Sequence, residues 1–179
     1  MTHAVSPTQV EVFFDRQDFI VSKTDLKGRL TYANKHFCDI AGYTEREVIG
    51  QPHAIIRHPD MPRAVFKLMW DAILQGREIF AYVKNMTKRG DHYWVLAHVT
   101  PSRDGKGEVI GFHSNRRVPD RSALEKILPL YRELIGIEKA HRNAKEGLAA
   151  SFGRLNAIIA GKADNTDKVK SYDEFIFSL

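Results

Sequence analysis

The sequence of 179 residues has a single cysteine, Cys38, and no long apolar run. One cysteine cannot form an intramolecular disulfide or a multi-cysteine metal site. No stretch approaches the roughly 20 apolar residues that cross a bilayer. Residues 1–9 lack the charged and apolar pattern of a secretory signal. These absences predict a cytoplasmic protein without a membrane span.

Clustered positive charge and catalytic signatures are absent as well. The formal net charge is only +5, and the lysines and arginines are scattered along the chain, whereas a nucleic-acid site favours a basic stripe with interleaved aromatics. The sequence contains no G-x-S-x-G elbow, no P-loop, no metal-ligand pair and no dinucleotide-dehydrogenase fingerprint. We therefore expect neither a nucleic-acid partner nor an enzyme.

The alternation of apolar runs and turn residues predicts an α+β fold. Residues 19–24 and 29–33 have strand patterns around a turn, and helix patterns follow at 34–41, 44–50 and 62–76. Three further strand patterns, at 79–87, 92–101 and 108–117, are joined by tight turns, which predicts an antiparallel meander. The expected architecture is a five-stranded antiparallel sheet with short helices on one face.

The two ends of the chain differ from this central region. We expect residues 1–17 to form an N-terminal cap, residues 18–118 the sheet domain and residues 119–179 a C-terminal helical extension. The extension has apolar residues at helical spacing, and Pro129 within it is expected to kink or restart the helix. Tyr172–Phe177 is too apolar for a free tail, which predicts docking on the domain or on a partner.

Two groups of motifs carry a family resemblance. Tyr32-Ala33-Asn34, followed by the segment 41–51, resembles the general signature of PAS domains. Gly50-Gln51-Pro52-His53, the segment 56–62, Val83-Lys84-Asn85 and the segment 90–95 resemble the sensory PAS domain of bacterial aerotaxis receptors. The resemblance runs from about residue 19 to residue 117.

This resemblance implies non-covalent binding of FAD and a redox-sensing role. It also implies signalling to a chemoreceptor or other signalling protein, with homodimerisation through the N-terminal cap, the sheet face or the C-terminal helices. Arg57 and His58 suit a phosphate or an electron-rich ring edge, and Asn85 can donate and accept hydrogen bonds at once. The positions that we carry over as cofactor-binding candidates are Asn34, Arg57, His58, Asp60, Asn85, Tyr93 and His113.

The sequence also departs from the family. A tryptophan that the family often has before the third strand is missing, and we expect Phe80 to replace it in part. His53 stands in the slot that holds the reactive cysteine of light-sensing flavin PAS domains, which excludes cysteine photochemistry. His113 stands where those domains have a glutamine. Trp70, on the longer helix, is expected to be a core residue.

Two alternatives to FAD stay open at this point. PAS domains also bind haem, and His53, His58 and His113 are the candidate axial ligands for haem b in a gas sensor. The third hypothesis is a cofactor-free adaptor that binds a partner protein or a small metabolite.

Overall fold

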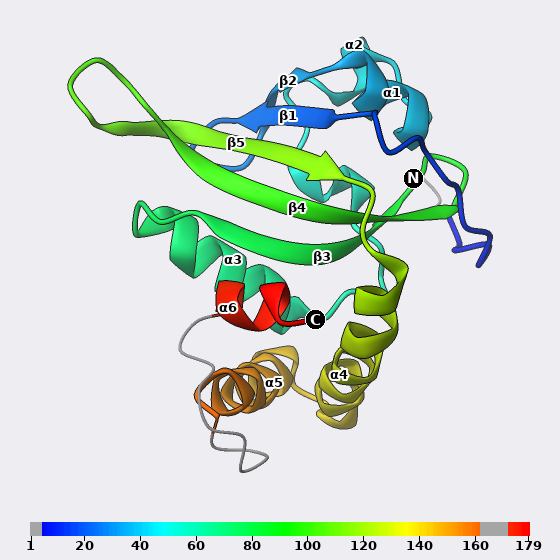
Figure 1. Ribbon diagram of the computed structural model, residues 1–179, viewed down its shortest axis with the longest axis vertical. Helices are drawn as coiled ribbons and strands as arrows, with labels where there is room; N and C mark the ends of the chain where they lie inside the picture. The colour runs from blue at the N-terminus through cyan, green and yellow to red at the C-terminus, as the bar shows by residue number, and fades with distance from the viewer. Residues whose placement is uncertain (1–4, 162–171) are drawn as a thin grey trace.

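The computed structural model describes residues 5–161 and 172–179, and one antiparallel sheet lies at its centre (Figure 1). Its five strands follow the order β2-β1-β5-β4-β3. Their bounds are β1 Ile20–Thr24, β2 Leu30–Ala33, β3 Ile79–Met86, β4 His92–Arg103 and β5 Val109–Arg117. The α+β sheet expected from the sequence is therefore confirmed, meander included.

The chain between β2 and β3 forms α1 (Lys35–Ala41), α2 (Glu45–Val48), the 3₁₀ helix η1 (His53–Ile56) and α3 (Arg63–Leu74). Asn34 caps α1, because its Oδ1 accepts from the Phe37 amide at 3.0 Å. Thr44 and Glu47 form a capping box that starts α2. These elements cover one face of the sheet, which we call the inner face.

The C-terminal helices are α4 (Arg121–Ala140), α5 (Ala144–Ile159) and α6 (Tyr172–Phe177), and they lie together beyond β3 in Figure 1. The α4 helix continues through Pro129 instead of restarting there. The chain then turns at residues 141–143, and α5 packs closely against α4. A Cβ atom at Gly147 would lie 2.7 Å from the Glu138 carbonyl oxygen, so this crossing requires glycine.

The opposite, outer face of the sheet is covered near β3 and β4. The Tyr131 hydroxyl of α4 donates to the Tyr82 carbonyl oxygen at 2.7 Å, and the Tyr131 ring stacks on Trp94. The Phe80 amide of β3 donates to Asp173 Oδ1 of α6 at 2.8 Å. The C-terminal segment Tyr172–Phe177 thus packs on the sheet.

The described part of the N-terminal segment lies along the beginning of β4. The His92 amide donates to the Val10 carbonyl oxygen at 2.8 Å, and the Val12 amide donates to the His92 carbonyl oxygen at 2.7 Å. Among the described residues, no helix combines the length and the apolar composition needed to cross a membrane.

Glu138 joins the C-terminal helices to the beginning of α3. Its carboxylate accepts from the amides of Arg63 and Ala64 at 3.1 and 3.0 Å, from Arg63 Nε at 3.2 Å and from Ser151 Oγ at 3.0 Å. Only 9% of its side chain is exposed. A carboxylate from α4 therefore satisfies the free amides at the start of α3, which Pro62 cannot cap with a side-chain hydrogen bond.

We predict that Glu138→Ala lowers the free energy of unfolding by about 2 kcal/mol, because it removes a helix cap and leaves buried donors unpaired. The control is Glu133→Ala on the same helix, whose exposed ion pair with Arg154 contributes at most about 1 kcal/mol. Urea denaturation measures both. Equal losses in the two variants would contradict the capping role.

Candidate ligand cavity

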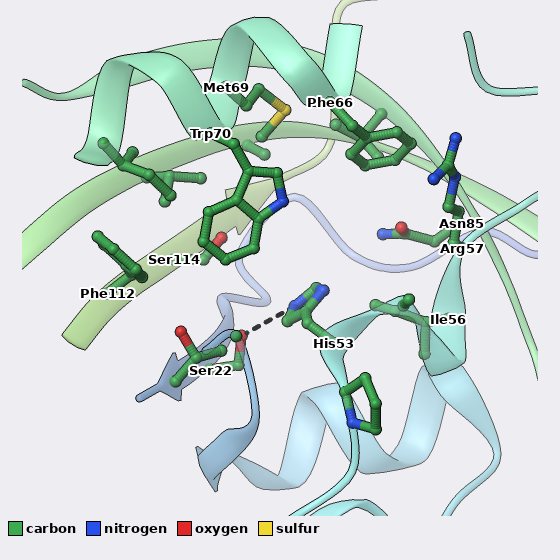
Figure 2. A pocket seen from close by; sticks show the side chains of 18 of the residues that line it. Ser22, His53, Ile56, Arg57, Phe66, Met69, Trp70, Asn85, Phe112 and Ser114 are labelled. Atoms are coloured by element: carbon green, nitrogen blue, oxygen red, sulfur yellow. Dashed lines mark hydrogen bonds between the residues drawn. The ribbon is translucent and has the colours of Figure 1, made fainter. Parts of the chain in front are cut away.

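A cavity of about 500 Å³ lies between the inner face of the sheet and the helices η1 and α3 (Figure 2). Small side chains of the sheet face it: Ser22 of β1, Ala97 of β4 and Ser114 of β5. Leu148 of α5 also lines it, so the C-terminal extension takes part in the enclosure. A volume of this size is typical of small-molecule sites.

Aromatic side chains form one wall of the cavity. Trp70 points from α3 into the space and meets Phe112 edge to face, with 5.6 Å between ring centroids. A Cβ atom at residue 28 would lie 2.9 Å from the indole, so Gly28 makes room for the ring. Trp70 is thus half-buried and packs against the hydrophobic core, and it also lines the cavity.

Asn85 and Arg57 meet at one end of the cavity. Their backbones form an isolated β-bridge at the free edge of β3, and both side chains line the cavity. The Asn85 Nδ2 atom is buried and has no hydrogen-bond partner within the described chain. The Arg57 guanidinium lies over the Phe66 ring at 4.4 Å, and burial lowers its pKa. The end near β3 therefore offers one unused donor and one cation.

Arg116 of β5 brings a second cation to the lining. Only 3% of the Arg116 surface is exposed to solvent. Its Nη2 atom donates to Ser22 Oγ at 2.9 Å and to His53 Nε2, whereas Nη1 has no partner in residues 5–161 and 172–179. Burial lowers the pKa of Arg116 to about 10, so the guanidinium stays charged at neutral pH.

His53 is neutral beside this cation. Burial and the positive charge of Arg116 lower the pKa of His53 to about 3. Its Nε2 atom therefore acts as an acceptor for Arg116, which assigns the ring proton to Nδ1. The pair provides no negative charge, and among the described residues no carboxylate forms an ion pair with Arg116.

A second, more open hollow adjoins the cavity and shares Ala54, Arg57 and Arg63 with it. Its other charged residues come from the end of α4 and the turn after it, namely Glu138, Lys139 and Arg142. Glu138 is already engaged by the start of α3. Of the charged residues that line the hollow, Arg57, Arg63, Lys139 and Arg142 are cations, and Glu138 is the one carboxylate.

Comparison with known proteins matches residues 30–116 to the PAS fold family. The chain carries a PAS domain. It is 38% identical over 140 residues to the aerotaxis receptor of Escherichia coli, which covers 78% of this chain and 27% of the receptor. It is 36% identical over 98 residues to phototropin-2 of rice (Oryza sativa subsp. japonica), which covers 54% of this chain and 11% of that protein.

The PAS fold is also evident in solved structures. The light-state structure of the blue-light photoreceptor Aureochrome1 LOV superposes with a TM-score of 0.54 at 23% identity, covering 64% of this chain and 90% of that one. At this identity the similarity concerns the fold alone. The chain spans about a quarter or less of the curated relatives' own lengths.

Of the seven residues predicted as cofactor contacts of the PAS domain, Arg57 and Asn85 line the cavity and the other five do not. Asn34 instead joins α1 to the neighbouring strand, because its Oδ1 also accepts from the Val21 amide at 3.0 Å and its Nδ2 donates to the Phe19 carbonyl oxygen at 2.6 Å. It holds the fold together next to the site.

His58 and Asp60 lie on the far side of β3 from the cavity. The fully buried His58 accepts at Nδ1 from the Asp60 amide at 3.0 Å, and the Asp60 carboxylate lies 3.4 Å from Lys84 Nζ. The His58 ring meets His92 edge to face at 5.7 Å. Asp60 therefore fixes His58 and not Arg57, and neither side chain lines the PAS cavity.

Strand alternation places the remaining candidates. Phe112 and Ser114 point inward, so His113 between them points to the outer face. Phe80 also points outward, where it stacks on His98 at 4.1 Å and contacts Phe177 of α6, so it does not replace the missing tryptophan. Tyr93 is fully buried opposite Asn85 in the sheet but does not reach the lining.

The sequence reasoning missed the cluster formed by Ser22, His53 and Arg116, although it noted His53. Period-two alternation from Phe112 to Arg116 on the last strand was the available signal, because it puts an arginine on the apolar face. The partners of that arginine lie 94 and 63 residues away in sequence, so no local pattern joins them.

We predict a pH-dependent stability that originates from His53. The folded state keeps His53 neutral down to about pH 3, whereas an unfolded histidine binds a proton below about pH 6.5. The unfolded state therefore binds more protons in this window, and the stability falls as the pH is lowered from 6.5. Between pH 7 and pH 5 the wild type should lose about 1–2 kcal/mol more than His53→Gln does.

Urea denaturation at the two pH values checks this difference. His141→Gln, which removes an exposed histidine, is the control and should keep the wild-type pH dependence. An unchanged pH dependence in His53→Gln would contradict this prediction, because it would show that the ring binds its proton equally well in the folded and unfolded states.

Proposed function

We propose that this chain is a redox sensor whose PAS cavity binds the ring of FAD and which signals to a protein partner. The supporting observation is that three buried polar groups without partners in the described chain line one cavity: Asn85 Nδ2, Ser114 Oγ and Arg116 Nη1. Buried polar groups are normally satisfied. A flat ligand with hydrogen-bonding groups along its edge would satisfy them.

The isoalloxazine ring of a flavin meets these requirements. It presents carbonyl oxygens and ring nitrogens along one edge and apolar carbon at the other. Asn85 and Arg116 suit the polar edge, and the aromatic wall formed by Phe66, Trp70 and Phe112 suits the ring faces and the apolar end. When bound, the flavin supplies the electron-accepting chemistry that a redox sensor requires.

The basic hollow next to the cavity favours a dinucleotide over a mononucleotide. Arg57 lines both spaces, and Lys139 and Arg142 border the outer one. Guanidinium and ammonium groups are the usual partners of phosphate oxygens. A ring in the cavity would direct its phosphates toward this hollow, which suits the diphosphate of FAD.

Haem is less well supported than flavin. Of the three candidate axial ligands, only His53 lines the cavity, and its Nε2 atom faces the Arg116 guanidinium. Ligation through this nitrogen would require the hydrogen bond with Arg116 to break. His58 and His113 lie outside the lining.

Strand β3 provides the connection from ligand to partner in this proposal. Val83 and Asn85 face the cavity, while Phe80 and Tyr82 on the same strand contact α6 and α4. A change in hydrogen bonding at Asn85 would therefore act on a strand that the C-terminal helices hold. The similarity to an aerotaxis receptor supports a chemoreceptor, another signalling protein or a second copy of the chain as the recipient.

We predict that protein supplied with FAD and haem shows flavin absorbance in the blue and near ultraviolet. Asn85→Ala should weaken flavin binding about tenfold, because one buried donor to the ring is lost. Asn115→Ala, on the outward-pointing side of β5, is the matched control and should bind as the wild type does. A sharp Soret band would support haem instead, and a colourless protein would support the adaptor hypothesis.

We further predict that the double variant Lys139→Gln/Arg142→Gln weakens FAD binding about threefold to tenfold and leaves riboflavin binding unchanged, because riboflavin has no phosphate. Arg132→Gln, which removes one exposed positive charge from α4 outside the hollow, is the control. Calorimetric titration of each variant with both ligands measures the difference. Equal losses for riboflavin and FAD would contradict phosphate binding in the hollow.

A further inference from the structure

Arg116 is the one described lining residue that combines near-complete burial with a full charge. Lys27, Arg57, Arg63 and Lys67 also line the cavity, but each of them is partly exposed. Arg116 lies between Ile20 of β1 and Ala97 of β4 in the sheet, so its strand neighbours are apolar. Water therefore screens this charge less than it screens the other cations of the cavity.

The immediate contacts of Arg116 are polar or aromatic but not anionic. The Nη2 atom donates hydrogen bonds to Ser22 and to the neutral His53. The centroid of the Phe37 ring lies 5.7 Å from the guanidinium carbon. Nη1 stays without a partner in the described chain. A buried cation is normally matched by an anion or by a full set of acceptors, and the protein supplies neither here.

We infer that Arg116 makes the cavity selective for the anionic, reduced state of the ring it binds. This inference rests on the proposed flavin function and goes beyond it, because it assigns Arg116 to the redox equilibrium rather than to binding as such. Arg116 is a positioning and charge-matching residue in this role. The binding preference follows from the direction of charge: the oxidised ring is neutral, and the guanidinium attracts the ring once it carries a negative charge.

Two electrons from an external reductant and one proton from solvent convert the neutral oxidised flavin into the singly charged reduced flavin. A second proton would neutralise that anion, and the nearby Arg116 charge opposes its uptake. Tighter binding of the reduced anion than of the oxidised ring raises the midpoint potential of the bound flavin. A tenfold preference corresponds to about 30 mV for a two-electron couple.

The experiment measures the midpoint potential of FAD on the full chain, in excess FAD, by titration with dithionite against a reference dye. The variants are Arg116→Gln, Arg116→Lys and the control Arg117→Gln, which removes the same charge from the next residue. Arg117 is exposed and lies over the Phe19 ring. We expect Arg116→Gln to lower the potential by about 30 mV or more, Arg116→Lys to retain most of the wild-type value, and Arg117→Gln to match the wild type.

The outcomes separate this inference from the function on which it rests. A wild type that binds no flavin refutes the proposed function itself. A wild type that binds flavin refutes only the present inference if the potential of Arg116→Gln stays within about 10 mV of the wild-type value, or if Arg117→Gln lowers it equally. If Arg116→Gln loses oxidised and reduced FAD to the same extent at every FAD concentration, Arg116 is a general binding residue and selectivity for the reduced state is refuted.

Discussion

The cavity and the packing of the C-terminal helices both depend on the alternating direction of side chains along strands β3, β4 and β5. Residues with one parity face the cavity and residues with the other parity face the C-terminal helices, because successive side chains of a strand point to opposite faces. Val83 and Asn85 face inward, while Tyr82 lies against Tyr131 of α4. A register slip of one residue would exchange the two sets and destroy both surfaces.

The inner face also explains how a small domain keeps a cavity without losing its core. Around the cavity the sheet presents small side chains, Ser22, Ala97 and Ser114, where a filled interior would have larger ones. At the periphery, residues such as Phe37, Leu30 and Val48 pack tightly and are almost fully buried. The space is thus confined to one region, and Gly28 on its rim admits the Trp70 ring.

Much of the fold could be predicted from local patterns, whereas the site could be predicted only in part. Turn residues, capping residues and strand alternation identified the five strands and the short helices, because each signal lies within a few residues of its effect. The Arg-His-Pro-Asp segment was harder, since Arg57 enters the lining and His58 turns to the opposite side of β3. In an irregular segment such as this one, the direction of the Arg57 side chain does not determine the direction of the His58 side chain.

Residues joined across the sequence could not be predicted at all. The contact between His53 and Arg116 depends on where β5 pairs with β1, which no local pattern specifies. His113 was chosen by its alignment with a glutamine in related domains, yet the alternation places its neighbours Phe112 and Ser114 in the lining. For such residues a sequence gives the chemistry that is available, and the register decides which part of it reaches the ligand.

The C-terminal helices are part of the site, although the sequence suggested a separate extension after residue 118. Leu148 of α5 lines the cavity, and Lys139 and Arg142 border the adjoining hollow. Glu138 satisfies the free amides at the beginning of α3, the same helix that brings Phe66 and Trp70 to the cavity. Because one helix supports the ligand wall on one side and the C-terminal helices on another, a ligand that moves α3 must also change the packing of α4 and α5. In the proposed function, the shared helix α3 would link the state of the ligand to the packing of the C-terminal helices.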